Sequence, residues 1–86
     1  MKIIAHRINT IKKLQKIPKK YGVEIDIRFF KNKLVLSHDP YKSGDCFKKY
    51  LSKYNHSLLV ANIKESGIED EVIREIKKRN IKEYFL

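Results

Sequence analysis

The chain has 86 residues and a net charge of +10, with 35% charged and 42% hydrophobic residues. This length suits one small domain, and the interleaving of charged and apolar residues argues against a disordered chain. No apolar run reaches transmembrane length, and the only cysteine, Cys46, has no partner for an internal disulfide. The basic charge favours an anionic partner without choosing among nucleic acid, a membrane surface and a phosphorylated molecule. These features predict a globular cytoplasmic domain.

Two elements are predicted before residue 22, a short strand and a helix. Residues 2–5 form an apolar run typical of a buried strand, and His6-Arg7 stands at its end. Asn9-Thr10 is typical of a helix N-cap, and the apolar residues of segment 11–17 recur at helical spacing.

A β-hairpin is predicted over the next segment. Residues 23–29 alternate between apolar and polar side chains, which places Glu24 and Asp26 on one face of a strand. Asn32 tolerates the left-handed backbone of a tight turn, so residues 34–37 are predicted to return as the second strand. Both carboxylates should therefore point the same way.

The second half of the chain alternates between helices and strands. Residues 45–55 predict an amphipathic helix and residues 58–64 a strand. Ser66 and Glu69 have the spacing of a capping box at the start of a third helix, and residues 81–86 predict a last apolar strand.

This alternation indicates an α/β fold with parallel strands joined by right-handed crossovers. The expected architecture is a partial (β/α) TIM-type barrel with about four parallel strands, a β-hairpin insertion and three helices. A complete barrel takes about 250 residues, so residues 1–86 are expected to form one N-terminal half-barrel. Open strand edges would favour pairing between copies, and a homo-oligomer is expected.

Polar residues stand near the carboxyl ends of the predicted strands, where the chemistry of parallel α/β folds collects. They are His6-Arg7, Glu24-x-Asp26, His38-Asp39 and Asn62-x-Lys64. Each pair alone is weak evidence for a functional site, because a single histidine is usually structural and an alternating strand usually has a solvated face. Their joint placement predicts one site.

The segments "IAHR", "VEIDIR" and "LVLSHDP" resemble, in this order, motifs of the glycerophosphodiester phosphodiesterase family, part of the phosphatidylinositol phospholipase C-like phosphodiesterase superfamily. The resemblance covers nearly the whole chain, but only the N-terminal half of a typical member. It implies a hydrolase of lipid metabolism that cleaves glycerophosphodiesters with a divalent metal, Ca²⁺ or Mg²⁺.

The resemblance also implies a role for each residue of the predicted site. His6 and His38 would be the catalytic general acid and base, in an order that the sequence leaves open. Arg7 and Lys64 would bind the substrate phosphate. The metal ligands would be Glu24, Asp26 and Asn62.

The departures from the family concern the metal and the loop after His-Arg. The third metal-binding glutamate of the family falls on Asn62, which brings no charge, so weak metal binding is expected. Ile8 replaces the usual glycine, and a Pro-Glu-Asn-Thr segment is missing. A chain that holds only the first half of such a barrel lacks one wall of the site, so it should be weakly active or inactive alone.

Two other interpretations remain open at this point. The chain could be a noncatalytic binding module for an anionic phosphorylated ligand, or a small basic RNA-associated protein in which the histidines and acids are incidental. Nucleic-acid binding is the weaker interpretation, because most lysines recur at helical spacing typical of solvated faces and no nucleic-acid-binding motif accompanies them.

Overall fold

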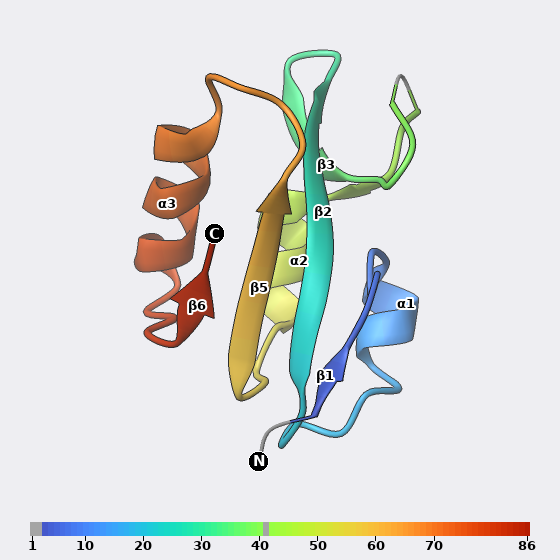
Figure 1. Ribbon diagram of the computed structural model, residues 1–86, viewed down its shortest axis with the longest axis vertical. Coiled ribbons are helices and arrows are strands. Elements are labelled where there is room, and N and C mark those ends of the chain that lie inside the picture. The colour runs from blue at the N-terminus through green and yellow to red at the C-terminus, as the bar shows by residue number, and fades with distance from the viewer. Residues whose placement is uncertain (1–2, 41) are drawn as a thin grey trace.

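A six-stranded mixed sheet carries the fold (Figure 1), as seen in a computed structural model that describes residues 3–40 and 42–86. The strands are β1 (Ile4–Ala5), β2 (Gly22–Phe30), β3 (Lys33–Leu36), β4 (Asp45–Cys46), β5 (Leu58–Ile63) and β6 (Tyr84–Phe85). The helices are α1 (Ile11–Leu14), α2 (Phe47–Lys53) and α3 (Glu69–Lys78). The sheet order is β4-β3-β2-β5-β6, and β1 pairs with β2 outside this path.

Strand β2 is the centre of the sheet because it pairs with three others. Its first residues run parallel to β1, with Ile4 opposite Gly22, and its last four run antiparallel to β3. Along its other side it runs parallel to β5, with Asp26 opposite Asn62. Strand β5 in turn runs parallel to β6, and β3 runs antiparallel to β4.

The expected partial TIM-type barrel is wrong. The sheet is open and mixed, and the hairpin belongs to it rather than being an insertion beside a barrel, since β3 and β4 extend it by antiparallel pairing. The reason is the turn at Lys31 and Asn32, both left-handed with φ of 49° and 63°, which returns the chain along β2 beyond the end of β1. This turn confirms the predicted hairpin.

The core lies on the face of the sheet that the helices cover. Val23, Ile25 and Ile27 of β2 are fully buried there, in one cluster with apolar residues of all three helices. Figure 1 shows α2 behind β2 and β5. The alternate residues Glu24 and Asp26 lie on the opposite face, which no helix covers in the described part of the chain. The predicted alternation of this strand is confirmed.

The start of α1 agrees with the sequence, whereas the starts of α2 and α3 differ. Thr10 caps α1, and its Oγ1 accepts a hydrogen bond from the Lys13 amide at 3.1 Å. The prediction of a capping box at Ser66 is wrong. Helix α3 starts after Ile68, which makes no side-chain cap bond. Helix α2 begins at Phe47 rather than at residue 45, because Asp45–Cys46 pairs with β3 as β4.

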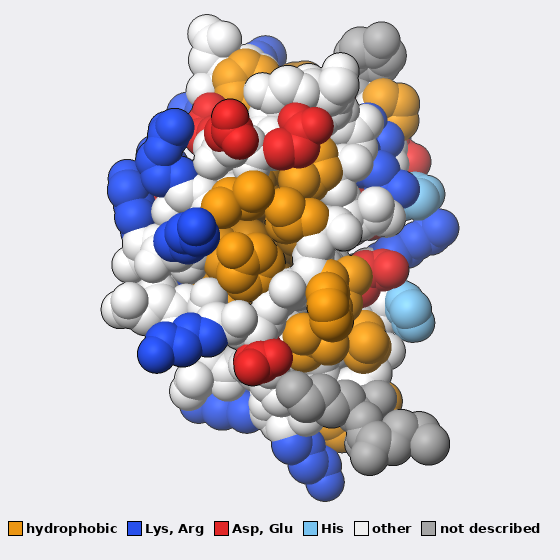
Figure 2. Space-filling view, turned by 60° about the vertical axis from the view of Figure 1, so that its left-hand side comes forward, with side chains coloured by type: hydrophobic (Ala, Val, Ile, Leu, Met, Phe, Trp, Pro, Cys, Tyr) orange, Lys and Arg blue, Asp and Glu red, His pale blue; other side chains and the backbone are white. Residues whose placement is uncertain are grey.

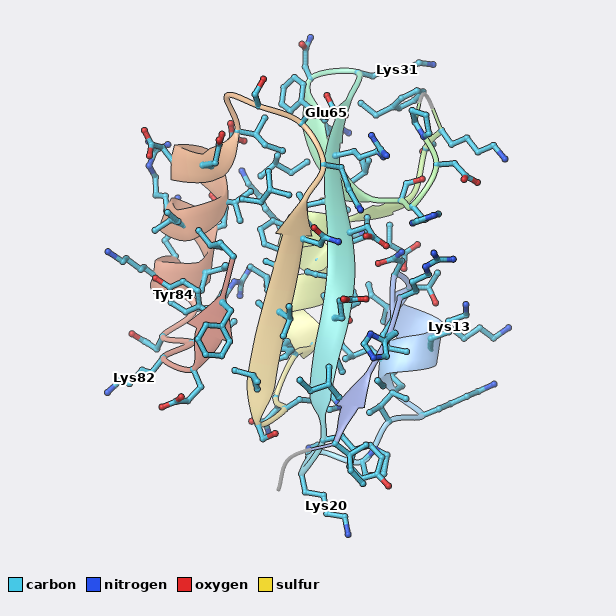
Figure 3. All side chains as sticks on the ribbon, in the orientation of Figure 1. Lys13, Lys20, Lys31, Glu65, Lys82 and Tyr84 are labelled. Carbon is cyan, nitrogen blue, oxygen red and sulfur yellow. The ribbon has the colours of Figure 1, made fainter. Side chains whose placement is uncertain are left out.

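Basic side chains lie around the outside of the sheet. Lys13, Lys20, Lys31 and Lys82 point outward from its ends and margins (Figure 3). Figure 2 shows apolar side chains gathered in the middle of one face, bordered both by lysines and arginines and by acidic side chains. Three large apolar residues in the described chain are more than half exposed: Ile3, Phe85 and Leu86. None of the helices among residues 3–40 and 42–86 has the length and apolar character needed to cross a membrane.

Candidate functional site

The loop after β1 is fixed against β2 by the backbone. The Ile8 amide donates to the Glu24 carbonyl at 2.9 Å, and Arg7 adopts a left-handed φ of 53°. From the other side of the loop, the Tyr50 hydroxyl donates to the Ile8 carbonyl at 2.6 Å. These bonds hold His6 and Asn9, on either side of Ile8, beside the uncovered face of β2.

His6 lies next to Glu24. Its Nδ1 is 3.2 Å from Oε1 of the carboxylate, while the His6 side chain is 73% exposed and that of Glu24 25% exposed. Because the contact uses Nδ1, Nε2 of the same ring remains directed elsewhere. The contact can orient the ring for a proton transfer through Nε2.

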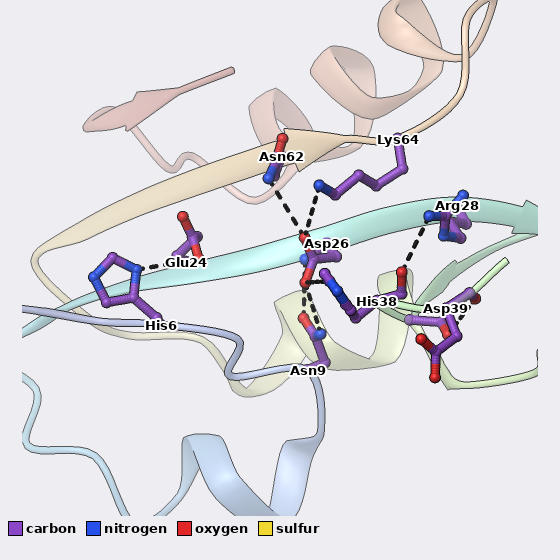
Figure 4. A network of polar contacts seen from close by, with 10 residues as sticks. His6, Asn9, Glu24, Asp26, Arg28, His38, Asp39, Asn62 and Lys64 are labelled. Carbon is purple, nitrogen blue, oxygen red and sulfur yellow. Dashed lines mark hydrogen bonds and ion pairs between the residues drawn. The ribbon is translucent and has the colours of Figure 1, made fainter.

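Asp26 is the most enclosed charged residue of the site, with an exposed fraction of 2%. Asn9 contacts it twice: its Nδ2 donates to Oδ2 at 3.0 Å, and its Oδ1 accepts from the Asp26 amide at 2.9 Å. Asn62 donates from Nδ2 to Oδ1 at 3.4 Å, with its carbonyl oxygen pointing away from Asp26 (Figure 4). A buried carboxylate is thereby supplied with donors rather than left uncompensated.

Two further side chains bring positive charge or a titratable ring to Asp26. Lys64 Nζ lies 3.7 Å from Oδ1, and His38 Nδ1 lies 3.6 Å from Oδ2. The His38 side chain is 44% exposed, so its ring reaches from the buried carboxylate to solvent. Arg28 donates from its guanidinium to the His38 carbonyl at 3.1 Å and so holds the segment after β3.

These contacts define what we term the β2 cluster, shown in Figure 4. Its members share the uncovered face of the sheet: His6, Asn9, Glu24, Asp26, Arg28, His38, Asn62 and Lys64. The cluster lies along the middle of β2 rather than beyond its end, because β2 continues to Phe30 as one arm of the hairpin. A hollow of about 440 Å³ opens beside the cluster, lined by Asn62 and Lys64 together with Glu65, Glu69 and Leu86.

Most of the sequence-predicted site residues meet in this cluster, and Arg7 is the exception. The Arg7 side chain is exposed and makes no polar contact with the described residues. Asn9 and Arg28 are cluster members that sequence reasoning missed. The alternation of β2 carries a signal for Arg28, which falls on the face of Glu24 and Asp26, whereas Asn9 reads as part of a helix cap.

Comparisons of the chain with protein-family models, with curated proteins and with solved structures found no match. What the site can do therefore rests on its own geometry.

Tyr50 supports the cluster from the core side. It is fully buried, and burial, with smaller contributions from Tyr54 and Asp45, raises the pKa of its phenol far above the ordinary value. The phenol therefore stays protonated and remains a hydrogen-bond donor to Ile8. A second hydrogen bond joins this part of the chain to α1: Asp45 Oδ2 accepts from the Ile11 amide at 2.7 Å.

The donor set fits a divalent cation poorly. No three His, Cys, Asp or Glu side chains of the described chain gather into a group that could hold a metal ion. Glu24 leans to His6, both oxygens of Asp26 already have donors, and Asn62 presents its amide nitrogen. Ca²⁺ and Mg²⁺ prefer several oxygen ligands with negative charge, which this arrangement does not converge on one point.

Proposed function

We propose that the chain binds phosphodiesters of the glycerophosphodiester type at the β2 cluster, and hydrolyses them slowly or not at all when isolated. The observation that carries this proposal is the pair of histidine–carboxylate contacts, His6 with Glu24 and His38 with Asp26, on one face beside Lys64. The ordered motifs that resemble glycerophosphodiester phosphodiesterases support it.

The histidines have the environment of an acid–base pair. Both contact their carboxylates through Nδ1, which leaves Nε2 of each ring for a substrate. One imidazole would take the proton of the attacking water, and the other would give a proton to the leaving alcohol. Each such role typically contributes about 10²–10⁴-fold to a rate. Lys64 would hold the phosphate, and the hollow beside it leaves room for an alcohol substituent.

Slow turnover follows from the openness of the site. The His6 and His38 side chains are 73% and 44% exposed, and no described helix covers the face on which they lie. Water then reaches both imidazole rings, and a substrate is held from one side only. We therefore expect the chain to bind phosphodiesters measurably but to hydrolyse them slowly.

The test combines calorimetry with glycerophosphoethanolamine and hydrolysis of bis(4-nitrophenyl) phosphate. We expect measurable binding and, at most, slow hydrolysis that falls to background in His6→Ala and His38→Ala. His56→Asn is the matched control, because that ring contacts the Ile17 carbonyl away from the cluster. Absence of phosphodiester binding by the folded chain would refute the proposal.

Association between copies is a further part of this proposal. Strand β6 forms one edge of the sheet, and its Phe85 is 65% exposed. Apolar edge strands favour pairing with another chain, while the net charge of +10 opposes it. Sedimentation should therefore show association that grows with salt and weakens in Phe85→Lys.

A further inference from the structure

Polar groups of its own chain surround Asp26: Asn9 and Asn62 donate hydrogen bonds to its carboxylate, and Lys64 and His38 lie 3.7 and 3.6 Å from it. Oδ1 faces Asn62 and Lys64, and Oδ2 faces Asn9 and His38. A cation that bound Asp26 would therefore have to displace Lys64 or His38 from a residue that is 2% exposed.

The charges of the β2 cluster balance without a further ion. Lys64 and Arg28 carry two positive charges, and Glu24 and Asp26 carry two negative ones. Several carboxylates on one spot repel one another and need a dication to offset that repulsion. Asn62 lies directly opposite Asp26 in the sheet and carries no charge. A carboxylate at that position would add a third negative charge and would favour a bound dication.

Glu24 and Asp26 are also engaged separately. They point to the same face, but Glu24 contacts His6 of the β1 loop, whereas Asp26 contacts His38 and Lys64 from other segments. Two ligands that hold different partners are not preorganised to share one ion. Bringing them together would break both histidine contacts.

From these contacts we propose that the β2 cluster binds its phosphate ester without a divalent metal, with the Lys64 ammonium as the group that receives the phosphate. This inference rests on the proposed function, since it concerns the same ligand and the same site. Asp26 is then a positioning residue: it holds Lys64 and His38 at the cluster and does not contact the ligand through a metal.

The role of Lys64 follows from its position at the end of β5. Its amide donates to the Ile27 carbonyl at 3.0 Å, which fixes the backbone, while its side chain is 28% exposed. Because the Lys64 backbone is fixed and its side chain reaches solvent, the ammonium can contact Asp26 and a phosphate oxygen of the ligand at the same time. Lysine binds phosphate as a point charge in this manner.

The experiment measures binding of glycerophosphoethanolamine by calorimetry in EDTA and again with millimolar CaCl₂ or MgCl₂. We expect the same dissociation constant in all three conditions. Lys64→Met should weaken binding about tenfold, and Lys64→Arg should restore much of the loss because the positive charge returns. Lys53→Met is the control, since Lys53 is an exposed residue of α2 on the other side of the sheet.

A second variant adds a third carboxylate to the cluster. Asn62→Glu adds a third carboxylate next to Asp26, and we expect it to bind Ca²⁺ measurably in the absence of phosphate ester, whereas the unsubstituted chain does not. Binding of the ester only when metal is present, or tight Ca²⁺ binding by the unsubstituted chain, would overturn the metal-independent site. Loss of ester binding under every condition would instead overturn the proposed function itself.

Discussion

Asn9 holds Asp26 at both its side chain and its backbone, with bonds of 3.0 Å to Oδ2 and 2.9 Å from the amide. The two residues come from different segments, the loop after β1 and the middle of β2. The contact therefore ties the start of the chain to its central strand at the most enclosed charge of the cluster.

The first prediction concerns this tie. Asn9→Ala removes the acceptor of the Asp26 amide and one donor of its carboxylate, so the free energy of unfolding should fall by about 1–3 kcal/mol. Urea denaturation measures the change. Asn55→Ala is the matched control, because Asn55 is exposed, and it should stay within about 0.5 kcal/mol of the unsubstituted chain. Equal stability of the two variants would contradict a structural role for Asn9.

The second prediction compares two buried tyrosine hydroxyls. Tyr50→Phe leaves the Ile8 carbonyl without its 2.6 Å donor, and should cost about 1–3 kcal/mol of stability. Tyr54 is the counterpart, since its hydroxyl is buried with no hydrogen-bond partner in the described chain. Tyr54→Phe should therefore be neutral or stabilising, because it removes an unpaired polar group. Thermal unfolding of both variants checks the order, and a larger loss in Tyr54→Phe would contradict it.

The third prediction concerns alkaline pH. Burial raises the pKa of Tyr54 to about 12 and that of Tyr50 further. Above about pH 10, tyrosines of the unfolded chain lose protons that these two keep when folded. The unfolded state then binds fewer protons, so stability present below pH 10 is lost as the pH rises.

The measurement for this third prediction is a set of denaturation curves between pH 9 and 12. The loss of stability with pH should be shallower when both residues are phenylalanine. Lysines titrate in both proteins, so the difference between the two slopes isolates the two phenols. Identical slopes would show that these hydroxyls ionise equally in the folded and unfolded chains.

The fourth prediction concerns the close approach of β3 and the segment before β4. A Cβ on Gly44 would lie 2.0 Å from the Leu36 carbonyl oxygen, a backbone atom that cannot turn aside. Gly44→Ala should therefore lower stability by about 1–3 kcal/mol, as overpacking does. Ser43→Ala, at the exposed neighbouring position, should change little. A normal melting temperature for Gly44→Ala would place this segment away from β3.

The local features of the fold could be predicted because they depend on neighbouring residues. Alternation over β2 separates Val23 from Glu24 and so gives the two faces, and Asn32 marks the turn of the hairpin. Strand β4 could not be predicted in this way. It has two residues, and only its pairing with Val35 and Leu36 on another strand distinguishes it from the start of a helix.

The barrel was a wrong prediction for a related reason. Alternating strands and helices indicate crossovers, but they do not say on which edge a hairpin pairs or whether a sheet closes. The candidate site was easier to predict because each histidine, like each carboxylate, stands next to a buried run. Asn9 escaped prediction, since its bonds to Asp26 depend on how the β1 loop folds back. The predicted capping box failed for a similar reason. Gly67, with φ of 89°, turns the chain between Ser66 and the start of α3.

The uncovered charged face of β2 has one more consequence, for the accuracy of folding. Side chains alternate between the two faces of a strand, so a shift of β2 by one residue against its neighbours would turn Glu24, Asp26 and Arg28 toward the apolar core. Misaligned sheets would have to bury three unpaired charges, at several kcal/mol each. These three residues therefore disfavour misfolded alignments of the central strand, whether or not a ligand ever binds them.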